Sequence, residues 1–381
     1  MKAVILAGGY GTRLRPLTYT KPKPMLPLAG KPILQFIVEA VGREGFSDVI
    51  VTTNYFREQV IESFGDGSSF GVRLTYPEEK KPLGTAGSVK NSEEYLNETF
   101  AVIQGDNITE IKFTDILDFH RKKGGIATIA LLAVENPHLF GIAQLDSDNR
   151  ISSFKEKPGQ QEIFSNLASI GLYVLEPEVL NYIPDGVECD FAKNVFPSLL
   201  SSGEKMYGYP ARGFWTDTGV PENYVKAVRW ILSRLSQQKL AENVKLTGAS
   251  IKGPVEIGER TKIERGAEIV GPVVIGKDCV IGQNSRIAPD SVVESEVRIL
   301  ERAKVDGSLI YEETEIGVGS HLDNCIVAEK CKVGSDVNIH EMAMIGASCE
   351  IEDSVKLLRG SRVWPKIRIA QNSVVQGLVK H

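Results

Sequence analysis

The chain has 381 residues, of which 42% are hydrophobic and 24% are charged. This length exceeds one ordinary hydrophobic core and this composition is that of a globular protein, so we expect two domains. The net charge of −5 argues against nucleic acid or an anionic membrane as the partner, because both select a basic face.

The cysteines and the N-terminus indicate where the protein works. The five cysteines form no CxxC pair, and their odd number favours free, reduced thiols. No apolar run reaches the ~18 residues of a membrane-spanning helix, and the apolar N-terminus lacks a signal-peptide cleavage pattern. We therefore expect a cytoplasmic protein whose first residues form a buried strand.

Up to about residue 230, short apolar runs alternate with amphipathic stretches. The predicted strands are 2–7, 48–52, 72–76 and 100–104, and the predicted helices are 32–43 and 57–64. This alternation predicts an α/β domain with a Rossmann-like, mostly parallel sheet and helices on both faces. Ligands of such sheets bind beyond the carboxyl ends of the strands, where the loops after Ala7 and Gln104 are expected.

The first of these loops carries the strongest motif, LAGGYGTRL over residues 6–14, followed by KPKPMLP over residues 21–27. Three glycines directly after a strand let the backbone turn tightly and direct N–H groups at an anion. Arg13 and Lys23 add positive charge suited to a triphosphate. Leu14 stands where a dinucleotide fingerprint needs its third glycine, and a Walker loop would need Gly-Lys-Ser/Thr. The expected nucleotide-binding residues of this loop are Leu6, Ala7, Gly8, Gly9, Gly11, Thr12 and Arg13.

Near residue 250 the pattern changes to an aliphatic residue at every sixth position. The repeat runs through Ile251, Ile257, Ile263, Ile269, Ile275, Ile281, Ile287, Val293, Ile299 and Val305. After a slip near Tyr311 it resumes as Val333, Ile339, Ile345, Ile351, Leu357, Val363 and Ile369. Hexapeptide repeats of this kind mark a parallel β-helix, and the pattern resembles that of left-handed β-helices.

An amphipathic stretch over residues 223–240 predicts a helix between the two halves. The domain prediction is therefore a catalytic domain over 1–230, a helical linker over 231–247 and a β-helix over 248–381. Flat stacked faces and open coil ends favour self-association, so we expect a homo-oligomer formed through the β-helix.

The segments GGYGTRLRPLT and KPKPMLPLAGKPIL resemble the signature of the nucleoside-diphosphate-sugar pyrophosphorylase family, and the resemblance continues through most of residues 1–230. Members of that family join a nucleoside triphosphate to a sugar 1-phosphate and release pyrophosphate. The most similar subgroup is the mannose-1-phosphate guanylyltransferases, several of which carry a C-terminal hexapeptide β-helix. The resemblance thus implies a sugar-1-phosphate nucleotidylyltransferase.

Two aspartates are the candidate ligands of Mg²⁺. Asp106, in the segment QGDN, follows a buried strand at the edge where ligands bind, and Mg²⁺ takes few protein ligands because it retains substrate phosphates. Asp217, in FWTDTG, matches the second metal-binding acid of the family. With Arg13 and Lys23, both aspartates are expected to be catalytic.

The sugar site is implied by the resemblance alone. Lys157 corresponds to the family lysine that holds the sugar phosphate, and it is the fifth expected catalytic residue. Glu156 would accept hydrogen bonds from sugar hydroxyls, and Gly141 would let the sugar approach the backbone. Ser169 replaces an asparagine common in the family, which leaves the sugar open.

Base choice is expected in the segment EEKKPLGTAG, residues 78–87. Guanine offers two adjacent donors, N1–H and N2–H, and a carboxylate such as that of Glu79 is a natural acceptor for both. The segment containing Gly84 and Thr85 is similar to the guanylyl subgroup. These features favour GTP and mannose 1-phosphate, with thymidylyl or uridylyl transfer to glucose 1-phosphate as the alternative.

Two further hypotheses stay open at this point. The β-helix could carry an acetyltransferase site with His321 or His340 as the base, as in fused bifunctional enzymes. The chain could also be a regulatory subunit without catalysis, although all five expected catalytic residues are present.

Overall fold

The computed structural model describes residues 1–380, and their packing divides into two compact units. The first comprises Met1–Tyr10, Lys23–Met25 and Ile33–Asp217. The second comprises Gly11–Pro22, Leu26–Pro32 and the chain from Thr218 onward. Two short N-terminal segments therefore pack with the C-terminal half of the chain, an arrangement that the sequence pattern does not indicate.

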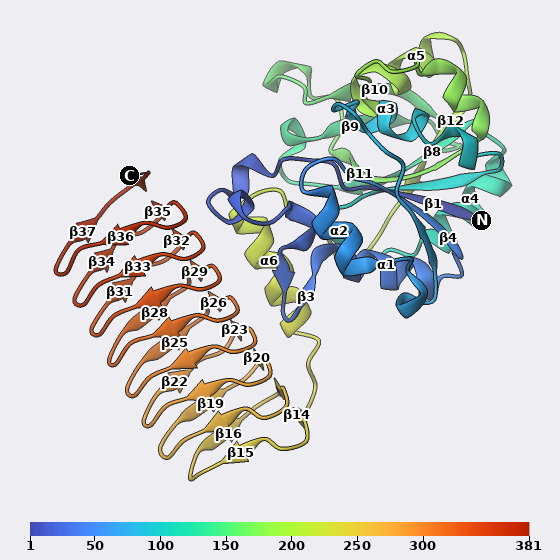
Figure 1. The fold of residues 1–381 in the computed structure, drawn as a ribbon. Helices are drawn as coiled ribbons and strands as arrows, with labels where there is room; N and C mark the ends of the chain where they lie inside the picture. The colour runs from blue at the N-terminus through green and yellow to red at the C-terminus, as the bar shows by residue number, and fades with distance from the viewer. Residues whose placement is uncertain (381) are drawn as a thin grey trace. The chain divides into compact units, whose positions relative to one another are not determined.

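A nine-stranded sheet forms the centre of the first unit (Figure 1). Seven strands follow one another in the order β10 (Ile151–Glu156), β9 (Gly141–Leu145), β11 (Leu167–Leu175), β6 (Phe100–Gln104), β1 (Lys2–Leu6), β4 (Asp48–Thr52) and β5 (Arg73–Thr75). Two more extend it, β8 (Ala127–Ala133) beside β11 and β12 (Met206–Pro210) beside β8.

Strand direction changes within this sheet. The neighbours β6, β1, β4 and β5 are parallel, whereas β11 runs antiparallel to β6, β8 and β9. Antiparallel neighbours need only short connections, and β9 and β10 are joined by five residues, 146–150. The predicted α/β class is confirmed, and the parallel half of the sheet is the part that the strand–helix alternation predicted.

Helices cover both faces of this sheet. They are α1 (Ile33–Arg43), α2 (Arg57–Phe64), α3 (Gly84–Lys90), α4 (Phe113–Lys123) and α5 (Phe196–Ser201). Successive side chains of a strand point to opposite faces. On one face Val4 packs in a cluster with Val89 of α3, and on the other Ala3 and Ile5 are fully buried.

A two-stranded antiparallel ribbon of β7 (Asn107–Thr109) and β13 (Trp215–Asp217) completes the first unit. The second unit contains a small hairpin of β2 (Pro27–Leu28) and β3 (Lys31–Pro32), and it contains α6 (Pro221–Leu232).

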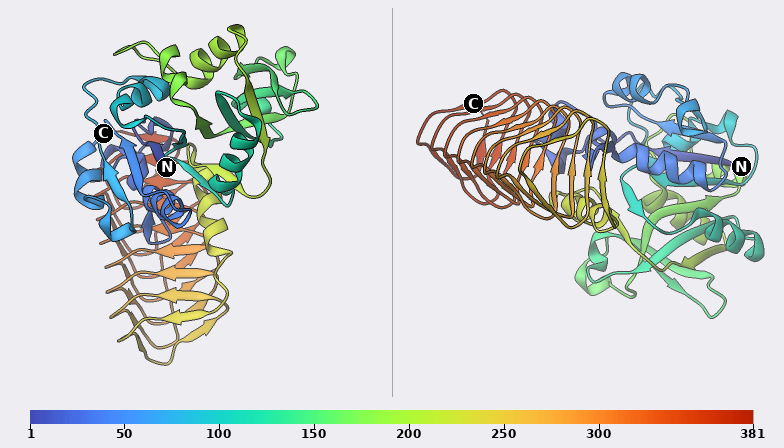
Figure 2. Two further views of the ribbon diagram at one scale, coloured as in Figure 1. Left: turned by 90° about the vertical axis from the view of Figure 1, so that its right-hand side faces the viewer. Right: turned by 90° about the horizontal axis from the view of Figure 1, so that it is seen from below.

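The rest of the second unit is a parallel β-helix, whose coils stack in Figure 2. Its first sheet holds β14 (Gln238–Leu240), β17 (Val255–Ile257), β20 (Val273–Ile275), β23 (Ser291–Val293), β26 (Leu309–Ile310), β29 (Ile326–Val327), β32 (Met344–Ile345), β35 (Arg362–Val363) and β38 (Leu378–Val379). Its second holds β15 (Lys245–Leu246), β18 (Lys262–Ile263), β21 (Val280–Ile281), β24 (Arg298–Ile299), β27 (Glu315–Ile316), β30 (Lys332–Val333), β33 (Glu350–Ile351) and β36 (Arg368–Ile369). Its third holds β16 (Ser250–Lys252), β19 (Glu268–Val270), β22 (Arg286–Ile287), β25 (Lys304–Asp306), β28 (His321–Asp323), β31 (Asn338–Ile339), β34 (Lys356–Leu357) and β37 (Val374–Val375).

The hexapeptide repeat determines which residues stack on one another in successive coils of this β-helix. Ile257 pairs with Ile275, so one coil takes 18 residues, or three hexapeptides. The predicted slip near Tyr311 arises because two successive coils, from Val293 to Ile310 and on to Val327, take 17 residues each. The aliphatic residues of the repeat point inward and form one continuous core.

The predicted helix over 223–240 is correct only in its first part. The helix begins at Pro221 and ends at Leu232, and the prediction is wrong beyond that residue. Residues 238–240 form β14 instead, because their backbone groups pair with Val255–Ile257 of β17. The last residues of the predicted helix therefore belong to the first coil of the β-helix.

The cysteines behave as predicted, since all five are free and buried. Over residues 1–380, no helix is both long and apolar enough to cross a membrane.

Candidate active site

A pocket of about 400 Å³ opens at the carboxyl ends of β1 and β6 in the first unit. The loops after β1 and β6, the segment leading into α3, and Lys23 supply most of its wall. The lining residues are Leu6, Ala7, Gly8, Gly9, Tyr10, Lys23, Pro24, Thr52, Glu79, Pro82, Gly84, Thr85, Ser88, Gln104, Gly105, Asp106, Glu188 and Asp190. The pocket therefore lies at the carboxyl ends of the strands, where the sequence predicted that a ligand binds.

The strand register aligns the loops around this pocket. Leu6 at the end of β1 lies opposite both Thr52 of β4 and Gln104 of β6, so the three strands end together. The N–H of Gly105 donates to the carbonyl of Leu6 at 2.9 Å, and a Cβ at Gly105 would lie 2.7 Å from that oxygen. A glycine at position 105 is thus required for the two loops to meet.

Gly8 and Gly9 have a different reason to be glycines. An added Cβ at Gly8 would meet only the backbone nitrogen of Asn54, at 3.9 Å, and one at Gly9 would meet nothing within 4 Å. Both residues line the pocket, so side chains here would occupy space that the protein leaves open. This is the arrangement expected of a backbone that a ligand approaches closely.

The pocket holds a partly buried ion pair between two of the expected catalytic residues. Lys23 Nζ donates to Asp106 Oδ2, and the lysine is buried. Eighty-three residues separate the two in the chain. The pair keeps an ammonium and a carboxylate beside the glycine backbone, where each could exchange its partner for a phosphate or a metal ion.

The ribbon of β7 and β13 brings the second aspartate to the same region. Asp217 is paired with Asn107, the residue directly after Asp106. Two aspartates from distant parts of the chain are therefore close along the backbone at one end of this ribbon, and Asp106, but not Asp217, lines the pocket. Two carboxylate ligands suit Mg²⁺, which usually completes its octahedral shell with water and substrate phosphates. Residues 1–380 contain no group of three or more His, Cys, Asp or Glu side chains arranged to hold a metal.

Glu79 lines the pocket, and its carboxylate is held in one orientation. Its Oε1 accepts a hydrogen bond from the N–H of Leu83 at 3.0 Å, and its Oε2 accepts one from the hydroxyl of Ser88 at 2.9 Å. Each oxygen retains a second lone pair for a ligand donor. The sequence pattern did not indicate that this carboxylate is also bound within its own loop.

The neighbouring expected residues, Gly84 and Thr85, fix the start of α3. Gly84 adopts a positive φ of 72°, and a Cβ there would lie 2.5 Å from the carbonyl oxygen of Cys189. Thr85 Oγ1 accepts a hydrogen bond from the N–H of Phe191 at 3.0 Å. Both residues line the pocket and attach the segment around residue 190 to it.

The expected sugar residues gather on β9, β10 and β11. Gly141 pairs with Glu156, and a Cβ at Gly141 would lie 2.8 Å from Glu156 Oε2. Burial raises the pKa of the Glu156 carboxyl, although the nearby Lys157 ammonium, 3.8 Å away, lowers it. Lys157 has a positive φ of 43° and an exposed side chain, and Ser169 lies on β11. None of the four is among the residues that line the described pocket.

Two pocket residues, Glu188 and Asp190, were missed by the sequence analysis. Asp190 caps the following helical turn, because its side chain accepts a hydrogen bond from the N–H of Ala192 at 3.2 Å. The negative charge of Asp190 also raises the pKa of Glu156. Asp190 thus lines the pocket and interacts electrostatically with one of the expected sugar residues. Its position before an apolar helical run predicts a helix cap. The neighbouring sequence does not indicate that Asp190 lines a pocket together with residues about 100 positions earlier in the chain.

The remaining expected residues, Gly11, Thr12 and Arg13, belong to the second unit. Gly11 has a positive φ of 60° and precedes a short 3₁₀ helix over Thr12–Leu14. Its carbonyl accepts hydrogen bonds from the N–H of Leu14 at 2.9 Å and from the hydroxyl of Thr18 at 2.8 Å. The loop thus has a defined local fold.

A glycine-lined pocket at the strand ends, holding a lysine–aspartate pair, is the arrangement expected of an α/β domain that binds phosphate groups. Residues 2–234 match the family model described as nucleotidyl transferase, and the chain belongs to that family. Residues 269–379 match the model described as the GMPPB C-terminal domain.

Similar proteins extend over both units. The chain is 34% identical to a UTP–glucose-1-phosphate uridylyltransferase of Synechocystis, over 90% of this chain and 92% of that protein. It is 35% identical to a mannose-1-phosphate guanylyltransferase catalytic subunit beta of Drosophila pseudoobscura, over 97% of this chain and 94% of that protein. Among solved structures, HddC from Yersinia pseudotuberculosis complexed with GMP-PN is 26% identical, with a TM-score of 0.53, over 60% of this chain and 99% of that chain.

Proposed function

We propose that this protein transfers the guanylyl group of GTP to mannose 1-phosphate, in the presence of Mg²⁺, and releases pyrophosphate. The observation that carries the proposal is the partly buried pair of Lys23 and Asp106 beside the open glycine backbone of the pocket. This arrangement gives one place both a cation for phosphates and a carboxylate for a metal ion.

The reaction requires no covalent intermediate on the protein. An oxygen of the sugar phosphate attacks the α-phosphorus of GTP and forms a new P–O bond. The bond from that phosphorus to the bridging oxygen of the β-phosphate breaks, and pyrophosphate leaves with the electron pair. Catalysis then consists mainly of positioning and of charge neutralisation.

Each expected residue has one task in this scheme. Lys23 neutralises the reacting phosphates, Arg13 neutralises the leaving pyrophosphate, and Lys157 holds the sugar phosphate that attacks. Asp106 and Asp217 would hold Mg²⁺, which, when bound, draws charge from the phosphate oxygens as a Lewis acid. When phosphates bind, Lys23 can release Asp106 for that role, because the ammonium gains anionic partners in exchange.

The base assignment is supported by Glu79. Its carboxylate is oriented by Leu83 and Ser88, and its free lone pairs can accept from the N1–H and N2–H groups of guanine. The guanosine nucleotide in the similar HddC structure and the name of the Drosophila relative favour the same base. The name of the same Drosophila relative, a mannose-1-phosphate guanylyltransferase subunit, supports mannose 1-phosphate as the sugar.

A second candidate, uridylyl transfer to glucose 1-phosphate, is favoured by one observation. The Synechocystis relative carries that name and matches both units of this chain. Uracil presents a single N3–H between two carbonyl groups, which gives a fixed carboxylate one donor to accept from rather than two.

The decisive experiment measures pyrophosphate release over a matrix of five nucleoside triphosphates and several hexose 1-phosphates, with and without Mg²⁺. We expect GTP with mannose 1-phosphate to give the highest kcat/KM and release to require the metal. If UTP with glucose 1-phosphate is preferred, the second candidate is correct. Release that does not need a divalent metal would refute the assignment of the two aspartates.

The proposal also includes a cytoplasmic location and self-association through the β-helix. Five buried free thiols are compatible with a reducing compartment. Leu240 and Leu246 in the first coil, and Leu378 in the last, are exposed apolar side chains at open ends of the stack. Light scattering after size-exclusion chromatography should give a mass above one chain, and Leu246→Lys or Leu378→Lys should lower it.

A further inference from the structure

The loop that carries Arg13 lies along one sheet of the β-helix within the second unit. Gly30 donates its N–H to Glu294, after β23, at 2.9 Å. Lys21 donates to Glu312, after β26, at 2.7 Å, and Thr20 donates to Glu329, after β29, at 3.0 Å. The N-terminal segment therefore crosses successive coils of the same sheet in a fixed order.

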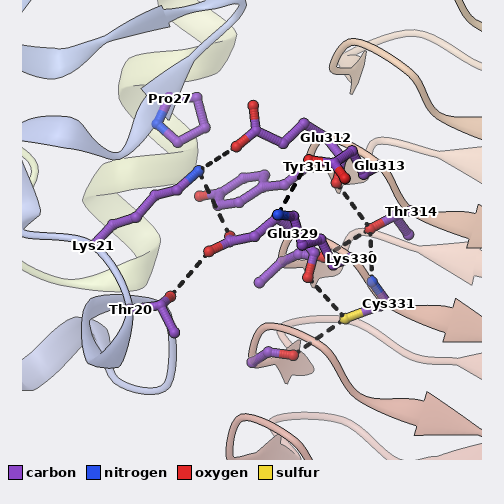
Figure 3. A network of polar contacts seen from close by, with 12 residues as sticks. Thr20, Lys21, Pro27, Tyr311, Glu312, Glu313, Thr314, Glu329, Lys330 and Cys331 are labelled. Carbon is purple, nitrogen blue, oxygen red and sulfur yellow. Dashed lines mark hydrogen bonds and ion pairs between the residues drawn. The ribbon is translucent and has the colours of Figure 1, made fainter. Parts of the chain in front are cut away.

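The contacts around Lys21 form a network rather than a single pair (Figure 3). Lys21 Nζ lies 2.7 Å from Glu312 Oε1 and 3.8 Å from Glu329 Oε2, so one ammonium bridges two coils. Glu329 is buried and uses its other oxygen for Thr20. A partly buried network of this kind fixes geometry better than an isolated surface ion pair.

A second set of contacts lies further along, at β35, and reaches Arg13 itself. Arg362 Nη1 donates to the carbonyl of Arg15 at 2.7 Å and to that of Arg13 at 3.4 Å. The ring of Tyr19 packs edge-on against Trp364 with a centroid distance of 4.9 Å, and Arg15 lies over the Tyr19 ring. The main chain within the 3₁₀ turn and directly after it is thereby tied to the β-helix.

We propose that this sheet of the β-helix holds the nucleotide loop in its binding conformation, with Arg362 and Glu329 as positioning residues for the triphosphate. The inference rests on the proposed function, since it assigns a nucleotide to this loop. A loop with a glycine at its start loses conformational entropy when it must order around a ligand. Anchors that order it in advance remove that loss from binding and strengthen it.

The test compares Arg362→Ala with Arg359→Ala. Arg359 lies three residues earlier and pairs with Glu341 at 3.5 Å, so its removal controls for the loss of one β-helix arginine. We expect Arg362→Ala to raise KM for GTP about tenfold, the size of one lost charge-assisted hydrogen bond, with KM for mannose 1-phosphate changed less than twofold. Arg359→Ala should leave both values unchanged.

Two further variants separate positioning from folding. Arg362→Lys should restore part of the affinity for GTP, because a single nitrogen makes both hydrogen bonds. Glu329→Gln keeps the side-chain size and should also raise KM for GTP. Its control is Glu313→Gln, since Glu313 pairs with Lys330 at 3.4 Å and takes no part in holding the loop.

Hydrogen exchange of the amides of residues 11–22 gives a readout that does not depend on turnover. We expect faster exchange in Arg362→Ala and Glu329→Gln, and wild-type exchange in both controls. Unchanged exchange, or faster exchange with unchanged KM for GTP, would overturn the inference. A wild-type protein that is inactive with every substrate pair would refute the proposed function instead. Hydrogen exchange of residues 11–22 and calorimetric measurement of GTP binding would then test this inference on its own.

Discussion

The two units of this protein relate sequence to structure in different ways. In the α/β unit, the expected catalytic residues Lys23, Asp106 and Asp217 are far apart in the chain. Lys23 contacts Asp106, and the register of β7 and β13 places Asp217 opposite Asn107. In the β-helix, one hexapeptide rule is repeated, and each coil contacts mainly its neighbours. Because the α/β site depends on strand register, a single substitution can disrupt it. The repeated core of the β-helix, in contrast, leaves the outer surface of the coils free for other contacts.

The largest effect should come from opening the repeated core. Ile299→Ala removes a fully buried side chain in β24 and should lower the free energy of unfolding by about 3 kcal/mol, because the stacked coils cannot collapse into the cavity. Urea denaturation followed by circular dichroism measures it. The matched control is Val374→Ala, whose side chain is 64% exposed, with an expected loss below about 0.5 kcal/mol. Equal losses would show that the repeat does not define the core.

The converse prediction concerns the α/β site. Asp106→Ala should lower kcat about 100-fold or more, equivalent to about 2.7 kcal/mol, since it removes preorganised charge from the reacting phosphates. Pyrophosphate release under saturating substrates measures it. The control is Asp118→Ala, which removes an exposed carboxylate 3.8 Å from Arg121. Near-normal turnover in Asp106→Ala would refute the role given to this residue.

Two glycines of the same pocket should respond in opposite ways. Gly105→Ala places a Cβ 2.7 Å from the Leu6 carbonyl and should cost about 2 kcal/mol of stability. Gly9→Ala meets no atom within 4 Å and should leave stability unchanged, but raise KM for GTP about tenfold by filling ligand space. Thermal unfolding and initial rates on both variants measure the two effects. If Gly9→Ala binds GTP normally, the glycine backbone is not the triphosphate site.

The last effect depends on pH and concerns a partly buried carboxyl group of the β-helix that faces the N-terminal segment. Burial raises the pKa of Glu294 from about 4.5 to about 7, with Glu312 acting in the same direction and the Gly30 N–H and Lys21 against it. The negative charge of Glu294 in turn raises the pKa of Tyr224, Tyr311 and Cys279. Because the folded state binds the proton more tightly, stability falls as pH rises from about 4.5 to 7.

Glu294→Gln should remove this dependence, because glutamine can accept the Gly30 hydrogen bond without ionising. We expect little difference from wild type at pH 4 and a gain of about 3 kcal/mol at pH 8, since moving a pKa from 4.5 to about 7 corresponds to a free energy of that size. Denaturation curves across this pH range measure the difference. A gain that does not vary with pH would indicate a packing effect rather than titration.

Sequence patterns predicted most of the local structure but less of what depends on distant contacts. Strands β4 and β6 and helix α2 have the predicted bounds, since each is a short, strongly patterned run. The helix prediction failed after Leu232, because an amphipathic stripe does not reveal where a coil begins. The antiparallel direction of β11 is a similar case, since a continuous apolar run carries no information on direction.

The same limit applies to the site. The glycines, Lys23 and Asp106 were predicted because their chemistry is visible beside a strand. Asp190 was not, since it reaches the pocket only through backbone contacts between Cys189 and the start of α3.

The two 17-residue coils have a consequence for how this β-helix can change in evolution. They lie between Val293 and Val327, the stretch that carries Glu294 and Glu312 and leads to Glu329. A duplicated coil before Val255 would lengthen the solenoid without changing the positions of these contacts relative to one another. A coil inserted after Val293 would shift the later contacts by about 4.8 Å, one strand spacing, away from the segment they hold. Lineages of this protein should therefore gain or lose coils at the ends of the stack and keep the number between Glu294 and Trp364 constant.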